Sequence, residues 1–258
     1  SIFNKVHGQE LAVDRCNRMR MYQDIPSAFD AWDIDSMVQQ RPVQLDTQAE
    51  ITVAADGPLF GQLVVKRKLH QSEMTQTITL RRDSRQMDFH TVIDWQERHK
   101  LLKVDFPVDY HVRNALHEIQ FGHLPRPTHR SRQMDQDQFE VSNHKWTALV
   151  EAGRGFAILN DSKYGVSALD ETISLTLLKS ALAPDMWADC GRQEFTYAFY
   201  FWDTPLINSS LVQRGYELNV APAVMAGNGG TRSLFTSDQP NIILDTVKPP
   251  EDGCQGDL

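Results

Sequence analysis

Short runs in which apolar and polar residues alternate fill most of the chain from Gln48 onward, and they constrain its fold more than any other feature. A period of two is typical of a strand with one buried face, because successive side chains point to opposite faces of a sheet. In the run QMDFHTVIDW, one face carries Met87, Phe89, Thr91, Ile93 and Trp95. The repeated rhythm of strand and turn predicts an all-β sandwich.

Turn-forming residues separate these runs. The clearest breaks fall at residues 56–58, 82–84, 122–127, 151–153 and 227–230. Gly, Pro, Asn and Asp favour such positions because they set or tolerate the backbone angles of turns. One further run, TISLTLLKSALA at residues 172–183, is ambiguous, since its leucines have helical spacing but it is equally compatible with a strand that ends before Pro184.

Composition limits the classes of function. With 258 residues, 41% hydrophobic and 23% charged, the chain is ordinary globular material for one large β-domain or two small ones. Its longest apolar runs, such as FAILN and TYAFYFW, are far shorter than the roughly 20 residues that cross a bilayer, so no membrane partner is predicted. The net charge of −8 argues against nucleic acid, which requires a positive surface.

The three cysteines, Cys16, Cys190 and Cys254, are odd in number and widely spaced. This fits reduced thiols better than a disulfide framework, and it predicts a cytoplasmic protein. The nine histidines show no ligand spacing, no HExxH motif occurs, and no C-x-x-C pair exists. We therefore predict no metal site within this chain.

The segment DIPSAFDAWDID, residues 24–35, groups acidic and aromatic side chains without a basic residue. Carboxylates accept hydrogen bonds from vicinal hydroxyls and an indole covers the apolar side of a sugar ring, so Asp30, Trp32 and Asp33 are candidates for a sugar-facing site. In the alternative interpretation, Trp32 is a core anchor and the aspartates cap turns.

A second candidate is the cationic segment after Gly122, which includes Arg126 and His129. Loops often carry function, so both residues are candidates for ligand contact. A structural role is the alternative, with Arg126 paired to Glu118 or Glu140 and His129 bonded to a carbonyl group.

Several motifs give the chain a family resemblance. Residues 117–146 contain HEIQFG, RPTH and FEVSNHKW, and collinear runs read FNKVHGQE, YQDIPSAFDAWDID, DWQERHKLLKVDFPVD, FAILNDSKYG, GRQEFTYAFYFW and ILDTVKPPEDG. Together they resemble the C-terminal β-domain of glycoside hydrolase family 38 α-mannosidases of the cytosolic or bacterial type. This resemblance implies a large two-sheet β-supersandwich of the galactose-mutarotase-like kind, spanning residues 46–258 of a 1–258 domain, with residues 1–45 leading toward a catalytic domain.

The resemblance also implies a function. The family hydrolyses α-mannosides with retention, using a nucleophilic aspartate and zinc or a similar divalent ion on an N-terminal domain that this chain does not contain. We therefore expect a fragment without catalytic residues that lines or buttresses the active site and is inactive alone. Its implied partners are that catalytic domain, an α-mannoside oligosaccharide and, because family members often assemble, a second copy.

Two more residues are candidates through the resemblance alone. Tyr22 matches a tyrosine that contacts substrate, and Lys179 stands where many members have an arginine near the substrate. Lysine lacks the planar fork of guanidinium, so a bidentate contact is not expected there.

Two other functions remain alternatives. One is a stand-alone carbohydrate-binding β-sandwich. The other is a mutarotase-like sugar epimerase, for which His90, His117 and Glu118 are the only nearby acid and base groups.

Overall fold

The computed structural model describes residues 1–45, 47–227, 229–239, 242–249 and 251. Cys254 and Asn228, which falls in the break predicted at 227–230, lie outside them. The chain divides into two compact units, Ser1–Ala221 and Pro222–Leu258. All helices and strands of the described residues lie in the first unit. Every candidate site residue also lies within that unit.

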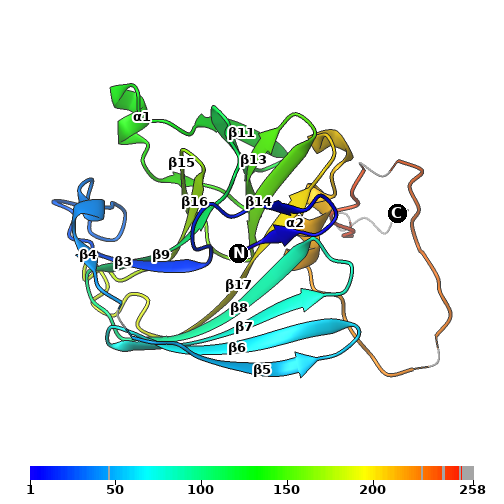
Figure 1. The fold of residues 1–258 in the computed structure, drawn as a ribbon, viewed down its shortest axis with the longest axis horizontal. Coiled ribbons are helices and arrows are strands. Elements are labelled where there is room, and N and C mark those ends of the chain that lie inside the picture. Colours follow the sequence, from blue (N-terminus) through cyan, green and yellow to red (C-terminus); the bar gives the residue numbers. More distant parts are fainter. Residues whose placement is uncertain (46, 228, 240–241, 250, 252–258) are drawn as a thin grey trace. The chain divides into compact units, whose positions relative to one another are not determined.

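Two antiparallel sheets make up most of the first unit (Figure 1). The nine-stranded sheet has the order β11-β10-β13-β14-β17-β8-β7-β6-β5. Its strands, in that order, are Gly122–Pro127, Asn114–Ile119, Trp146–Glu151, Arg154–Asn160, Gly191–Trp202, Gln86–Trp95, Ser72–Arg81, Phe60–Leu69 and Glu50–Asp56.

The six-stranded sheet has the order β12-β15-β16-β9-β3-β4. Its strands, in that order, are Val141–Ser142, Gly165–Leu169, Thr172–Lys179, Lys100–Pro107, Arg18–Gln23 and Pro42–Val43. A small third sheet pairs β1, Phe3–Asn4, with β2, Gln9–Glu10. The short helices are η1 (Val38–Gln40), α1 (Gln133–Asp137), η2 (Leu206–Asn208) and α2 (Leu211–Asn219).

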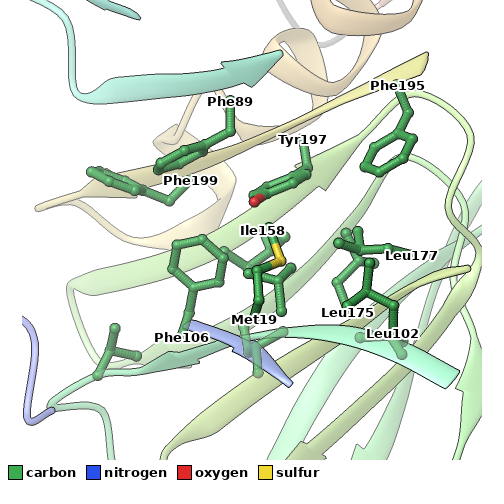
Figure 2. Packing of buried hydrophobic residues seen from close by; sticks show 14 of the residues in the cluster. Met19, Phe89, Leu102, Phe106, Ile158, Leu175, Leu177, Phe195, Tyr197 and Phe199 are labelled. Carbon is green, nitrogen blue, oxygen red and sulfur yellow. The ribbon is translucent and has the colours of Figure 1, made fainter. Parts of the chain in front are cut away.

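The main core lies between the two large sheets, as Figure 2 shows. Phe89 of β8 stacks on Tyr197 of β17, with ring centroids 5.1 Å apart, and Phe106 of β9 in the opposite sheet meets Phe89 edge-on at 5.8 Å. Side chains that alternate along each strand thus interlock between the layers. The predicted all-β, two-sheet supersandwich is confirmed. The face of β8 that carries Phe89, Ile93 and Trp95 points into this core.

A second apolar cluster covers the opposite face of the nine-stranded sheet. Trp146, Trp202 and their neighbours on β13, β14 and β17 pack there against Leu211 of α2. These three strands are therefore buried on both faces, which explains the near-continuous apolar run of residues 196–202.

The structure resolves one ambiguous run and corrects one predicted break. The ambiguous run at 172–183 forms strand β16, which is paired on both sides, with β15 and with β9. The break predicted at residues 122–127 is wrong, because this segment is strand β11, paired along its length with β10. Pro125 and Pro127 are tolerated because β11 is an edge strand. A proline there lacks only an N–H group that would face away from the sheet, so no hydrogen bond to β10 is lost.

The lead-in segment, residues 1–45, contributes strands as well. Its strand β3 pairs along its whole length with β9, and β4 pairs with β3. Part of this segment therefore belongs to the six-stranded sheet.

Candidate functional site

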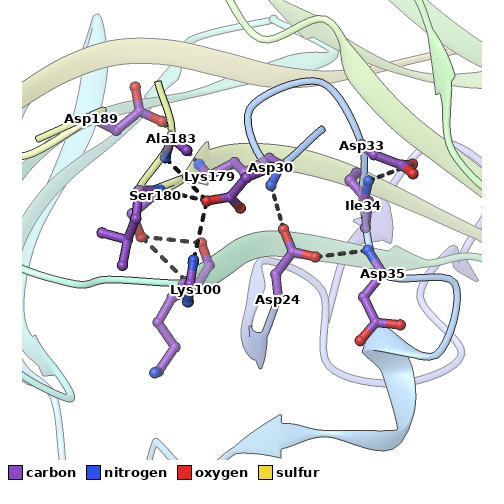
Figure 3. Close-up of polar contacts among 12 residues, drawn as sticks. Asp24, Asp30, Asp33, Ile34, Asp35, Lys100, Lys179, Ser180, Ala183 and Asp189 are labelled. Carbon is purple, nitrogen blue, oxygen red and sulfur yellow. Dashed lines mark hydrogen bonds and ion pairs between the residues drawn. The ribbon is translucent and has the colours of Figure 1, made fainter. Parts of the chain in front are cut away.

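The Asp30 carboxylate joins two loops that are distant in sequence (Figure 3). These are the Asp30 loop, residues 24–37, and the Pro184 loop, residues 180–190, which connects β16 to β17. Asp30 Oδ2 accepts hydrogen bonds from the N–H groups of Leu182, at 2.7 Å, and Ala183, at 3.2 Å. The Nε2 atom of His99 lies 3.1 Å from the same oxygen. Asp30 therefore fixes how the two loops meet.

The environment of Asp30 stabilises its charged form. Burial acts to raise the pKa of this carboxyl, but the Leu182 N–H, the His99 ring and the Ala183 N–H together hold the pKa below its ordinary value. Its other oxygen, Oδ1, is buried and has no partner among the described residues. An ionised, firmly held carboxylate suits a positioning role better than proton transfer, which calls for a pKa near the working pH.

Asp24 and Lys179 form a second link at the same place. Lys179 Nζ donates to Asp24 Oδ2 at 2.6 Å, and Asp24 is only 1% exposed. The Asp35 N–H donates to Asp24 Oδ1 at 2.8 Å, which closes the Asp30 loop on itself. The charge of Lys179 is therefore already paired within this chain.

Trp32 and Asp33 face away from the core. Trp32 is 75% exposed and is not the core anchor of the alternative interpretation. Asp33 is also exposed, and its Oδ1 accepts the Ile34 N–H at 2.9 Å, which is a local turn contact. An indole and a carboxylate thus remain accessible on the loop that Asp30 fixes.

Two further exposed aromatic residues belong to the same pair of loops, and the sequence interpretation did not single them out. Phe29 is 74% exposed and Trp187 is 66% exposed. The Arg98 guanidinium lies 4.5 Å from the Trp187 ring centroid and stacks on it. A signal for both was present, since each is a large apolar residue in a turn-rich segment outside the alternating runs.

Tyr22 lies on β3, on the face opposite the buried Met19 and Met21. It lines a cleft of about 710 Å³ together with residues 15–21. Burial, and then the nearby Asp105 carboxylate, raises the pKa of the Tyr22 phenol. Among the described residues, no hydrogen bond or ion pair connects Tyr22 to Asp30.

Arg126 and His129 form a separate group near α1. Arg126 Nη1 donates to Gln138 Oε1 at 3.3 Å, and His129 Nδ1 lies 3.8 Å from Asp135 Oδ2. Both line a small cavity of about 30 Å³. This group shares no hydrogen bond or ion pair with the Asp30 loop in the described part of the chain.

The expected ion pairs of Arg126 are wrong. Glu118 is paired with Lys145, whose Nζ lies at 3.1 Å, and Glu140 is paired with Lys103, whose Nζ lies at 2.5 Å. Arg126 instead donates to the neutral Gln138 side chain.

The acid and base groups needed by an epimerase do not meet. His117 is buried and bonded to Thr147, with 3.0 Å between Nδ1 and Oγ1. Glu118 follows it on β10 and so points to the opposite face of the sheet. His90 lies on β8, 3.3 Å from Glu194. The described residues bring these three groups into no common site.

The described residues contain neither a cluster of metal ligands nor a membrane-spanning helix. No group of three or more His, Cys, Asp or Glu side chains in that part of the chain could hold a metal ion, so we assign no zinc ligands to it. Within the same residues, no helix is long and apolar enough to cross a membrane.

Comparison with known proteins identifies the family. A family model described as glycosyl hydrolases family 38 C-terminal domain matches residues 1–186. The chain belongs to this family. The two-sheet sandwich and the motifs around residues 117–146 are thus features of a family 38 C-terminal domain.

Curated relatives of this family 38 domain are α-mannosidases. The chain is 37% identical to human alpha-mannosidase 2C1, in an alignment that covers 93% of this chain. It is 36% identical to alpha-mannosidase G of Dictyostelium discoideum, in an alignment that covers 92% of this chain. It spans 24% and 23% of the lengths of those two proteins. The relatives are therefore about four times as long as this chain.

A solved structure shows the same fold. An α-mannosidase from Enterococcus faecalis V583 superposes with a TM-score of 0.67 at 16% sequence identity. The superposition covers 83% of this family 38 domain and 28% of that protein.

Proposed function

We propose that this chain is the C-terminal part of an α-mannosidase that cleaves α-mannosides with retention of configuration. The observation that carries the proposal is the similarity to curated α-mannosidases along more than nine-tenths of the chain. Retention requires two carboxyl groups about 5 to 5.5 Å apart, one as nucleophile and one as acid/base. The proposal places both groups, and the divalent ion, in the remainder of the parent protein.

In this proposal, the Asp30 loop and the Pro184 loop face the catalytic domain and the mannoside substrate. Their exposed aromatic side chains, Phe29, Trp32 and Trp187, are suited to packing against a sugar ring or an apolar domain surface. Asp30 is a positioning residue that holds both loops through the Leu182 and Ala183 N–H groups. The domain would thus buttress the active site and have no activity alone.

The free thiols of Cys16 and Cys190 support a cytoplasmic parent protein. Burial raises the pKa of the Cys16 thiol to about 12, which keeps this thiol protonated and unreactive.

The test replaces Asp30 by alanine in the full-length parent protein. Losing its contacts frees both loops, so kcat/KM for a nitrophenyl α-mannoside should fall at least tenfold while the protein stays folded at the assay temperature. Asp56→Ala, an exposed aspartate at the β5–β6 turn, is the matched control and should leave kcat/KM unchanged. Equal kinetics in the Asp30→Ala and wild-type parent would contradict the positioning role. Absence of α-mannosidase turnover in the wild-type parent would contradict the function itself.

A further inference from the structure

The inner face of the nine-stranded sheet extends beyond the layer that covers it. Residues directly opposite each other on neighbouring strands share a face. One row across the sheet consists of Val53, Leu63, Ile78, Phe89 and Tyr197. The exposed fraction falls along it from 68% at Val53 and 38% at Leu63 to 3% at Phe89 and 0% at Tyr197. A single apolar row is therefore core at one end and bare at the other.

The reason lies in the opposite sheet. Strand β4 pairs with β3 only at Met21 and Tyr22, so in the described part of the chain Arg18–Arg20 has no strand on that side. The Gln23 N–H donates to the Arg41 carbonyl on the β4 side. Along a strand, the N–H and C=O groups of every second residue point to the same side. Met19 lies four residues before Gln23, so its N–H and C=O point to the same side as the Gln23 N–H, toward the unpaired edge of β3.

Two clefts occupy the space between this edge and the bare face. One, of about 710 Å³, runs along residues 15–22 and reaches Arg67 of β6. The other, of about 930 Å³, lies between residues 1–6 and inward side chains of β7 and β8, among them Ile78, Leu80 and Phe89. Both clefts are lined by Ser1, Cys16 and Asn17, so they meet. We call the combined space the open slot.

We propose that the open slot binds one additional β-strand, supplied by the part of the parent protein outside this chain. The strand would pair with β3 at Met19 and lay its inward side chains over Val53, Leu63 and Leu80. This would extend the six-stranded sheet until it covers β6 and β5, because an unpaired edge beside an apolar face is a template for strand addition.

The walls of the open slot define the chemistry of that strand. Its inward residues are apolar, since they would pack on the exposed apolar side chains of the row that ends at Val53. Its outward residue is acidic at the position that passes the exposed guanidinium group of Arg15. The proposal rests on the proposed function, in which relatives about four times as long supply the remaining polypeptide.

Amide hydrogen exchange tests the pairing directly. The Met19 amide is compared between the 258-residue chain and the full-length parent, with the Arg20 amide, which faces β9, as internal reference. We expect exchange at Met19 to be at least tenfold slower in the parent, with no change at Arg20. Equal Met19 rates in both proteins overturn the proposal. Protection that is already present in the chain also overturns it, and protection that grows with chain concentration would assign the slot to a second copy.

A pair of lysine substitutions on one strand tests the covered face. Leu63 lies on the inner face of the sheet, in the apolar row that ends at Val53, whereas the neighbouring Val64 points to the opposite face. In the parent, Leu63→Lys would be buried under the added strand and should lower Tm by at least 5 °C more than it does in the isolated chain. Val64→Lys should lower Tm equally in both proteins. Equal shifts for Leu63→Lys in both proteins overturn the proposal, whatever mannosidase activity the wild-type parent shows.

Discussion

His117 is a buried titratable side chain, and it makes the stability of the domain depend on pH. Burial, and then the positive charge of Arg126, lowers the pKa of His117 to about 4. In the unfolded chain a histidine has a pKa of about 6.5, so the unfolded state takes up the proton first as the pH falls. The contribution of neutral His117 to the free energy of unfolding is complete above pH 6.5 and is lost progressively as the pH falls to about 4. It amounts to about 3 kcal/mol.

Replacing His117 by glutamine should therefore flatten the pH dependence. We expect the free energy of unfolding to fall between pH 7 and pH 4.5 by about 2–3 kcal/mol less in the variant than in the wild type. Urea unfolding at both values measures the difference. A parallel loss in both proteins would show that other groups cause the acid sensitivity.

The Asp24–Lys179 pair is expected to stabilise the base of the Asp30 loop. Lys179→Met would leave the nearly buried Asp24 charge without its partner at 2.6 Å, and should cost about 3–5 kcal/mol of unfolding free energy. The double variant Asp24→Asn/Lys179→Met removes both charges and should recover most of this loss. Urea titration of the two variants checks the pair, and a loss below about 1 kcal/mol in the single variant would contradict a buried pairing.

At the scale of elements, one close approach within the nine-stranded sheet depends on a glycine. A Cβ atom at Gly155 of β14 would overlap the indole of Trp202 on the adjacent strand β17. Gly155→Ala should therefore cost about 1–3 kcal/mol, because the ring has to move within a packed cluster. Gly61→Ala on β6 is the control, since a Cβ there meets nothing within 4 Å. Thermal unfolding should separate the two variants, and equal Tm values would contradict the tight contact.

Edge strands were the elements that local patterns predicted least well. Central strands such as β8 have an apolar alternation, broken only at Thr91 and Val92, that indicates a strand directly. By contrast, β11 contains Gly122, Pro125 and Pro127, which indicate a turn when only neighbours in sequence are considered. Its pairing with β10 supplies the stabilisation that local propensity does not.

At the scale of the whole molecule, the isolated chain should show no mannosidase chemistry. Calorimetric titration with mannose and a short α-mannoside should give no binding heat, and a nitrophenyl-mannoside assay with added zinc should give no turnover. The physical reason is that the proposed catalytic carboxyl groups and metal lie elsewhere in the parent. Clear binding would instead support a stand-alone carbohydrate-binding module, and turnover would refute the proposed location of the catalytic residues.

The sequence by itself determined the all-β class, most central strands and the family, because alternation and collinear motifs are local properties of the chain. It also brought Asp30, Trp32, Asp33 and Lys179 forward as candidates. Only the tertiary structure decided their contacts, namely that Asp30 holds the Pro184 loop and that Lys179 pairs with Asp24. These partners are more than 150 residues apart, and their meeting depends on strand order and register, which no local pattern encodes.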